Sequence, residues 1–282
     1  MNRFCCLLFS AALCLSGFSQ KTAIRLIVRG DDMGYTHSGN LALIQSYAKG
    51  IEKSIEVIVP SPWFPEAVRL LKQNPGVDVG VHLCLSSEWE NIKWRPLTVC
   101  PSLQNENGYF FPMIYPNKNY PGQSLSEHHG NIQEIENELR AQILLAMKNI
   151  PGISHVSAHM GCTSISPEVK AVAKRLAKEY HISIDPEEKG VISVGYPGKH
   201  ETFAEKEAGF LQMLASLVPG KTYLFLDHPG LDNDELKAVY HIGYEKVAAD
   251  RQGVTDLFTS EKVKAAIRKR GIELIAYKDL AQ

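Results

Sequence analysis

Carboxylate and imidazole side chains stand at four places where an apolar run of residues ends. Asp31 and Asp32 follow the first such run, and His82, His159 and His228 lie at the ends of three later ones. One carboxylate and two imidazoles can hold a divalent metal ion and leave coordination positions open for water and substrate. The remaining carboxylate and imidazole would then serve as an acid–base pair. These residue types therefore predict a metal centre at which protons are also transferred.

Each of these features has a simpler explanation when it is taken alone. An adjacent pair such as Asp31-Asp32 often lies in a solvated loop or caps a helix. A single histidine at the end of a strand is commonly a structural residue that satisfies a hydrogen bond. The metal-centre hypothesis therefore depends on whether the four strand ends meet.

Apolar runs that alternate with amphipathic stretches predict strands that alternate with helices. The predicted strands are residues 24–28, 54–59, 77–83, 154–158, 181–184, 222–226 and 273–276. The predicted helices are residues 40–48, 63–73, 132–147, 167–179, 201–217, 234–239 and 261–270. This order is typical of an α/β fold with parallel strands and outer helices. About seven such units in one domain favour a (β/α) barrel over an open sheet.

Functional residues of parallel α/β folds gather at the carboxyl ends of the strands. We therefore expect the four strand ends that carry Asp31-Asp32, His82, His159 and His228 to face one mouth of the barrel. Their convergence would bring one metal-binding set and one acid–base pair to the same place.

Two further residues compete for a place at this site. Side chains two positions apart on a strand share a face, so Cys84 would lie near His82, and His155 lies on the strand that leads to His159. A Cys84 thiolate would be a metal ligand, but a small buried side chain is the favoured interpretation. For His155 we favour a contact with a metal ligand over direct binding of the metal.

An aromatic-rich insertion at about residues 86–130 interrupts the strand–helix alternation. A long irregular segment inside a compact domain is usually functional. Its aromatic residues include Trp89 and Trp94, which are candidates to stack against sugar rings because ligand pockets are commonly lined by aromatic side chains. Packing in the core is the alternative for these aromatic side chains.

A family resemblance rests on four segments that occur in order: RGDDMGYTHSGNLAL, DVGVHLCLSSEW, SHVSAHMG and FLDHPG. Together they resemble the YdjC-like carbohydrate deacetylases, also called the chitooligosaccharide deacetylase family, and the HMG sequence resembles one subgroup. The similarity extends from about residue 24 to residue 279. It implies a polysaccharide-deacetylase-like (β/α) barrel that hydrolyses the N-acetyl group of amino sugars or their oligosaccharides.

The resemblance also implies a role for each residue of the predicted site. Asp32, His82 and His159 would bind the metal ion, Asp31 would be the general base and His228 the general acid. The chemistry requires these opposite roles because water must lose a proton and the departing amine must gain one.

Two residues outside this set also bear on the site. Arg251, in the segment ADRQGVTDLF, is a candidate to orient a catalytic carboxylate, with a surface salt bridge as the alternative. The subgroup often has Asp where this chain has Ser157, so a carboxylate that supports a metal ligand would be absent here.

Two histidines and one carboxylate suit zinc, and zinc or magnesium is the favoured ion, with cobalt, nickel or manganese as alternatives. An O-acetyl esterase and a catalytically silent sugar-binding protein are the alternative functions. A retaining glycosidase built on Asp31 and Asp32 is disfavoured, because its two carboxyl groups must lie on either side of the scissile bond.

Composition limits the compartment and the partners. Arg3 followed by an apolar run and small residues predicts a signal peptide over residues 1–20 that is cleaved, so the protein would be secreted or periplasmic. Residues 21–282 would form a single catalytic barrel domain.

The formal net charge of −1 and the lack of a basic stripe give no sign of nucleic-acid binding. No other segment is long and apolar enough to span a membrane, and a homodimer is left open.

Overall fold

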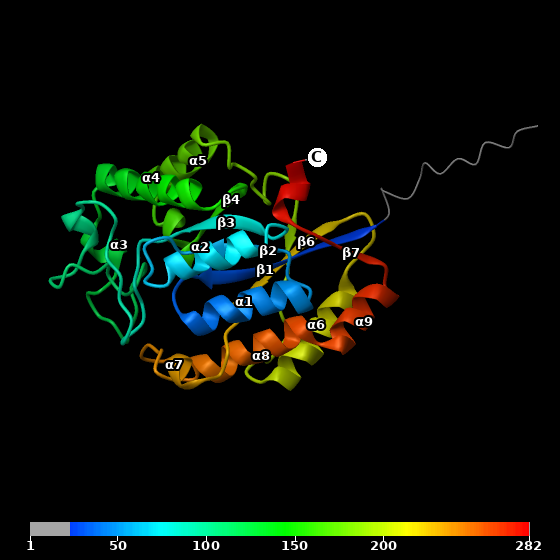
Figure 1. Ribbon diagram of the computed structural model, residues 1–282. Helices are drawn as coiled ribbons and strands as arrows, with labels where there is room; N and C mark the ends of the chain where they lie inside the picture. The colour runs from blue at the N-terminus through cyan, green and yellow to red at the C-terminus, as the bar shows by residue number, and fades with distance from the viewer. Residues whose placement is uncertain (1–22, 282) are drawn as a thin grey trace, which may run out of the picture.

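Seven parallel strands form one sheet in residues 23–281, the part of the chain that the computed structural model describes (Figure 1). The strands are β1 (Ile24–Met33), β2 (Ser54–Val57), β3 (Asp78–Leu83), β4 (Ile153–Ala158), β5 (Ile192–Ser193), β6 (Thr222–Asp227) and β7 (Ile272–Ile275). Their order across the sheet is β4-β3-β2-β1-β6-β5, and β7 also pairs with β1. Parallel strands and outer helices confirm the predicted α/β fold.

The central strand β1 organises the sheet. It pairs with β6 along one edge, while β7 and then β2 follow each other along the other edge. Its residues Leu26, Ile27 and Val28 are fully buried, as expected for a parallel strand that is covered on both faces. Within the described residues, β4 and β5 each pair with a single strand, so hydrogen bonds do not close the barrel between them.

Helices cover the sheet on both sides (Figure 1). The longer ones are α1 (His37–Lys49), α2 (Phe64–Gln73), α4 (Ile132–Asn149), α5 (Pro167–Glu179), α6 (Phe203–Ser216), α8 (Val247–Thr259) and α9 (Glu261–Lys269), and the short ones are α3 (Leu125–His128) and α7 (Asp234–Lys237). In this view α4 and α5 lie above the sheet, and α6, α8 and α9 lie below it. Side-chain oxygens of the residues that precede α1, α5 and α6 cap these helices, namely Thr36, Ser166 and Thr202.

Two predictions of local structure are corrected. The predicted strand over residues 181–184 is wrong: His181, two residues after the end of α5, has a φ of 58°, and the strand of this region is β5 at Ile192–Ser193. Helix α8 was not predicted, because it contains Gly253 and buries Arg251, which obscures the apolar pattern.

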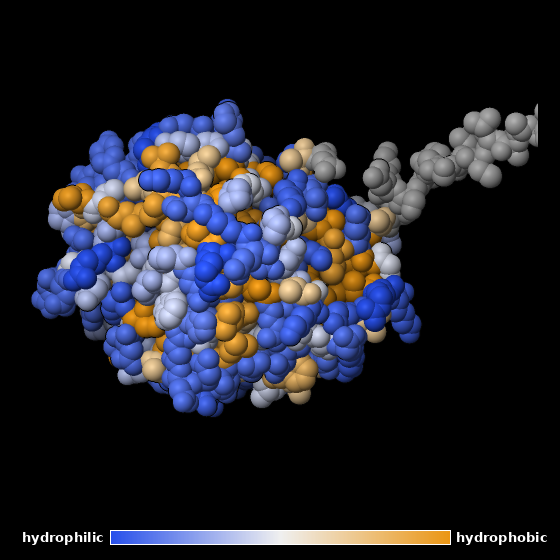
Figure 2. All heavy atoms as spheres, in the orientation of Figure 1, coloured by the Kyte–Doolittle hydropathy of each residue, from blue (hydrophilic) through white to orange (hydrophobic). Residues whose placement is uncertain are grey.

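The insertion at residues 86–130 holds α3 and a 3-10 turn at Pro101–Leu103 but is otherwise irregular. Trp94 and Phe110 lie in the main hydrophobic core, so core packing explains these two side chains. Among residues 23–281, no helix has the length and apolar character that crossing a membrane requires. The surface in Figure 2 is mostly hydrophilic, with hydrophobic residues in separate patches. The predicted signal peptide lies outside the described residues.

Candidate metal centre and active site

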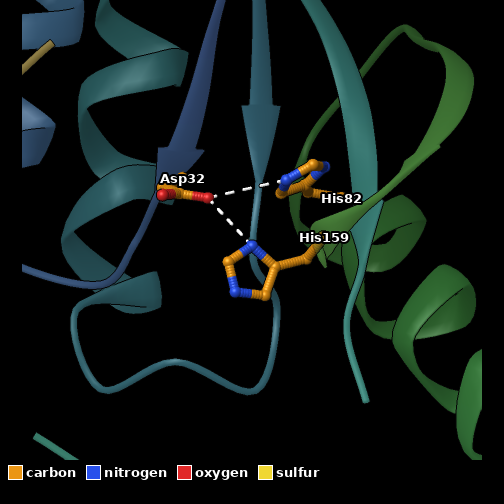
Figure 3. Close-up of side chains that lie close together, drawn as sticks. All are labelled: Asp32, His82 and His159. Carbon is orange, nitrogen blue, oxygen red and sulfur yellow. Dashed lines mark ion pairs between the residues drawn. The ribbon is translucent and has the colours of Figure 1, made fainter. Parts of the chain in front are cut away.

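Three of the predicted residues meet at the carboxyl ends of their strands (Figure 3). Asp32 lies near the end of β1, His82 near the end of β3, and His159 directly after β4. Asp32 Oδ1 is 3.1 Å from His159 Nδ1 and 3.5 Å from His82 Nε2. One potential ligand atom from each residue lies within 4.8 Å of the other two, and all three side chains are buried. The convergence predicted from the strand ends is therefore present.

The residues present fit a divalent cation. Asp32 Oδ1 is buried, and although the ring nitrogens of His159 and His82 lie near it, neither these nor any other described group donates a hydrogen bond to it with acceptable geometry. A buried carboxylate oxygen without a partner is costly, and a cation between it and the two imidazole nitrogens would remove that cost. One oxygen and two nitrogens are also a donor set that zinc and related ions accept.

Asp31 and Asp32 line the same cavity although they are neighbours in a strand. Successive side chains of a regular strand point to opposite faces. Here Asp32 has a φ of 73°, and the register between β1 and β2 shifts between Gly30 and Met33. Asp tolerates this left-handed conformation better than most residues. The local irregularity therefore turns both carboxylates towards one site.

The guanidinium of Arg29 donates a hydrogen bond to each oxygen of the Asp31 carboxylate. Its Nε donates to Oδ1 at 2.7 Å and its Nη2 to Oδ2 at 2.8 Å, while its Nη1 donates to the hydroxyl of Tyr277 at 2.7 Å. Burial alone would lower the pKa of Arg29, but the charge of Asp31 outweighs it and raises that pKa. The bidentate pair fixes the orientation of a carboxylate that could accept a proton. Arg29 was not predicted, although it lies two residues before Asp31 on the same strand.

His228 lies at the edge of the site. Its Nε2 is 3.8 Å from Asp32 Oδ2 and its Nδ1 is 3.5 Å from Asp227 Oδ1, and 34% of its side chain is exposed. Burial alone would lower its pKa, but the charge of Asp32 and the hydrogen bond with Asp227 together raise it. A partly exposed imidazole with a raised pKa is suited to give a proton to a bound substrate.

Both histidines of the candidate metal centre have a partner on the ring nitrogen that points away from Asp32. Glu88 Oε2 lies 3.0 Å from His159 Nε2, and Ser157 Oγ lies 2.7 Å from His82 Nδ1. Burial alone would raise the pKa of Glu88, but the charge of His159 lowers it. Metal-binding histidines usually have such a partner on their second nitrogen. Glu88 was not predicted, because it lies in the irregular insertion.

The other predicted residues have different surroundings. Arg251 is buried, so the surface salt bridge is excluded, and its Nη2 donates to Asp32 Oδ2 at 2.8 Å. His155 is buried and its Nε2 contacts Glu56, and among residues 23–281 no hydrogen bond joins it to Asp32, His82 or His159. The thiol of Cys84 donates to the carbonyl of Ser86, and burial raises its pKa to about 11, so it is a neutral, buried group.

The residues of the site line a cavity of about 380 Å³. It is lined by Arg29, Asp31, Asp32, His82, Glu88, Trp89, Ala158, His159, Met160, Leu226, His228, His241, Tyr244 and Arg251. Trp89 is among the lining residues but is only 2% exposed and packs in the main hydrophobic core, where its ring stacks on that of His241 with a centroid distance of 5.6 Å. Trp94 is 3% exposed and is not among the lining residues.

Comparisons with known proteins agree over nearly the whole described chain. A family model described as YdjC-like protein matches residues 25–269. A carbohydrate deacetylase of Enterococcus faecalis (strain ATCC 700802 / V583) is 26% identical over 268 residues, which cover 91% of this chain and 98% of that protein. Carbohydrate deacetylase 2 of Listeria innocua serovar 6a is 27% identical over 276 residues, covering 91% of this chain and 99% of the relative.

One solved structure supports the fold. It is a crystal structure from Enterococcus faecalis V583 of a protein provisionally described as a cellobiose-phosphate cleavage protein. It has a TM-score of 0.72 and 24% sequence identity, and the match covers 93% of this chain and 100% of that chain. The arrangement of strands and helices is therefore shared with an experimentally determined structure.

Proposed function

Because the chain belongs to the YdjC-like protein family, we propose that it is a metal-dependent hydrolase that removes acetyl groups from carbohydrates, in particular N-acetyl groups from amino sugars. The observation that carries this proposal is the meeting of Asp32, His82 and His159 around a buried carboxylate oxygen that has no hydrogen-bond partner. The carbohydrate deacetylases among its relatives support the substrate class.

One divalent ion would be held by Asp32 Oδ1, His82 Nε2 and His159. When bound, such an ion polarises an acetyl carbonyl and lowers the pKa of water to about 7. Zinc or magnesium is our proposal for the ion, with cobalt, nickel or manganese as alternatives, because the donor set suits several divalent metals.

The proton transfers fall to two residues of the chain. Asp31 takes a proton from the attacking water as the water oxygen bonds to the acetyl carbon, and Arg29 keeps its carboxylate in place. His228 gives a proton to the sugar nitrogen as the carbon–nitrogen bond breaks. The products are acetate and a free amine. The raised pKa of His228 supports its role as the acid, because it keeps the imidazole protonated at higher pH.

A second cleft in the protein supports an oligosaccharide as substrate. This cleft of about 600 Å³ is lined by residues of the segment 90–93, which directly follows Trp89, and by Trp63 and Tyr109. Trp63 comes after β2 and is 38% exposed, so its ring is available to stack on a sugar. We propose that sugar units next to the reacting one bind in this cleft.

Two finer points rest on sequence patterns alone. The sequence HMG at residues 159–161 supports membership of the HMG subgroup of the family. The pattern of residues 1–20 supports export through a cleaved signal peptide.

Release of acetate from N-acetylglucosamine oligomers, measured beside acetylxylan with zinc-loaded protein, tests the function. We expect acetate from the amino-sugar oligomers and little from acetylxylan. Release from acetylxylan alone would identify an O-acetyl esterase, and binding of the oligomers without any release would identify a silent sugar-binding protein. Either result would overturn the proposal.

A further inference from the structure

Glu56 is a buried carboxylate on β2 that takes no part in the chemistry described above. We propose that Glu56 is a positioning residue that fixes the metal-binding orientation of His82 through the hydroxyl of Ser157. This inference rests on the proposed metal centre and adds a three-residue relay to it: Glu56, Ser157 and His82.

The register of three neighbouring strands brings these residues together. Glu56 on β2 pairs with Gly80 on β3, and Gly80 pairs with His155 on β4. Two residues further along, His82 on β3 pairs with Ser157 on β4. Residues two positions apart share a face of the sheet, so all the side chains of both rows lie on the same side.

Gly80 provides the space in which the relay forms. A Cβ atom at this position would lie 2.5 Å from His155 Nε2 and would also overlap the carboxylate of Glu56. Because Gly80 has no side chain, Glu56 can reach across β3 to contact two residues of β4. Its Oε1 lies 2.5 Å from His155 Nε2, and its Oε2 accepts a hydrogen bond from the hydroxyl of Ser157.

The direction of the hydrogen bonds follows from what each group can donate. Burial alone would raise the pKa of Glu56, but the charges of His155 and Arg29 outweigh it and lower that pKa to about 2. An ionised carboxylate only accepts hydrogen bonds, so Ser157 must donate its single hydroxyl proton to Glu56. The oxygen of Ser157 must then accept from Nδ1 of His82, 2.7 Å away. The lone pair of a neutral His82 is thereby confined to Nε2, the atom nearest to Asp32.

His155 holds the far end of the relay. Its ring stacks on that of Tyr277 with a centroid distance of 3.8 Å and an interplanar angle of 3°. Its Nδ1 lies 2.7 Å from the hydroxyl of Ser154, which donates to Asp78. The carboxylate of Glu56 is therefore fixed on one oxygen and available to Ser157 on the other. Ser157 thus links the carboxylate of Glu56 to His82. An acidic residue in place of Ser157 would contact His82 directly.

The relay can be tested by competition for zinc between the full-length protein and a chromophoric chelator. Ser157→Ala breaks the relay, and we expect its zinc dissociation constant to rise on the order of 10–100-fold, the usual effect of losing such a partner. Ser157→Thr keeps the hydroxyl and should bind zinc like the wild type. Ser46→Ala is the matched control, because Ser46 is a buried serine without a hydrogen-bond partner among the described residues.

A double-mutant cycle separates the relay from a general packing effect. Glu56→Gln should weaken zinc binding to a similar degree, and Glu56→Gln combined with Ser157→Ala should weaken it no further, because both changes interrupt one chain of contacts. Zinc affinity unchanged in Ser157→Ala, or losses that add fully in the double variant, would overturn the inference.

Nitrogen NMR of the metal-free protein, at a pH where His82 is neutral, gives a test that needs neither metal nor substrate. The relay predicts a proton on Nδ1 of His82 and none on Nε2, and the opposite tautomer would refute it. A failure of the relay can be distinguished from a failure of the proposed function. A wild-type protein that releases no acetate leaves the relay intact if Ser157→Ala still weakens zinc binding.

Discussion

Both carboxylate oxygens of Asp31 accept hydrogen bonds from one guanidinium, that of Arg29, at 2.7 and 2.8 Å. The pair is buried and lies beside the candidate metal centre, where Asp31 Oδ2 is 3.8 Å from His82 Nε2. A general base works only when its oxygen lies in the path of the proton it accepts. The two hydrogen bonds therefore fix the orientation of the Asp31 carboxylate, which makes Arg29 a positioning residue for the proposed base.

Arg29→Lys keeps the positive charge but loses the bidentate geometry. We expect the protein to fold and bind zinc as before, while kcat falls on the order of 10–100-fold because the base is displaced by a fraction of an ångström to an ångström. Steady-state acetate release, together with the zinc content of the same preparation, measures both effects. An unchanged kcat would show that Arg29 does not position the base.

Asp227→Asn should change the pH dependence of activity. Asp227 helps to raise the pKa of His228, and the proposed acid acts only while it is protonated, so activity is lost as the pH rises through that pKa. Removing the negative charge should move this alkaline limb to lower pH and leave the acidic limb in place. A profile of kcat/KM against pH for both proteins makes the comparison. An alkaline limb that stays in place would argue against His228 as the acid.

Glu52 should make the protein less stable at higher pH. Its carboxylate is fully buried without a hydrogen-bond partner among the described residues, and burial, with the nearby charge of Asp31, raises its pKa well above the ordinary value. The folded protein thus keeps a proton that the unfolded chain releases above about pH 4.3. The stability contributed by this group is present below that pH and is lost as the pH rises towards the folded pKa.

Glu52→Met should remove this penalty. Urea unfolding between pH 4 and pH 8 should show a free energy of unfolding for the variant that exceeds the wild-type value most at pH 8 and least at pH 4. If the difference between the two proteins were the same at every pH, Glu52 would not be the group that titrates.

Trp63→Ala tests the cleft that is lined by Trp63, Tyr109 and residues 90–93. We expect kcat/KM for longer N-acetylglucosamine oligomers to fall by roughly fivefold, since stacking on an exposed aromatic ring contributes about 1 kcal/mol. The shortest substrate that is turned over should be unaffected. Equal losses for all chain lengths would mean that Trp63 does not contact the neighbouring sugar units.

Much of the site could be predicted from the sequence because parallel strands present their carboxyl ends on one side of a sheet. This rule was sufficient to bring together Asp32, His82 and His159, which are far apart in the chain. It also places His228 beside Asp32. No knowledge of the register was needed for that step.

The supporting residues could not be predicted in this way. Glu56 contacts Ser157 across β3, and this contact depends on the register of three strands and on the missing side chain of Gly80. Glu88 reaches His159 from an irregular segment that has no periodic pattern. Ser157 donates a hydrogen bond to Glu56, a residue about a hundred positions away in the sequence.

The central claim is that one divalent ion binds between Asp32, His82 and His159. A crystal structure of the zinc-loaded protein, with the zinc located by anomalous scattering, tests it most directly. We predict a single strong peak about 2.0–2.2 Å from Asp32 Oδ1, from His82 Nε2 and from a ring nitrogen of His159. No peak between these three side chains at saturating zinc, or a peak held by other residues, would contradict the account.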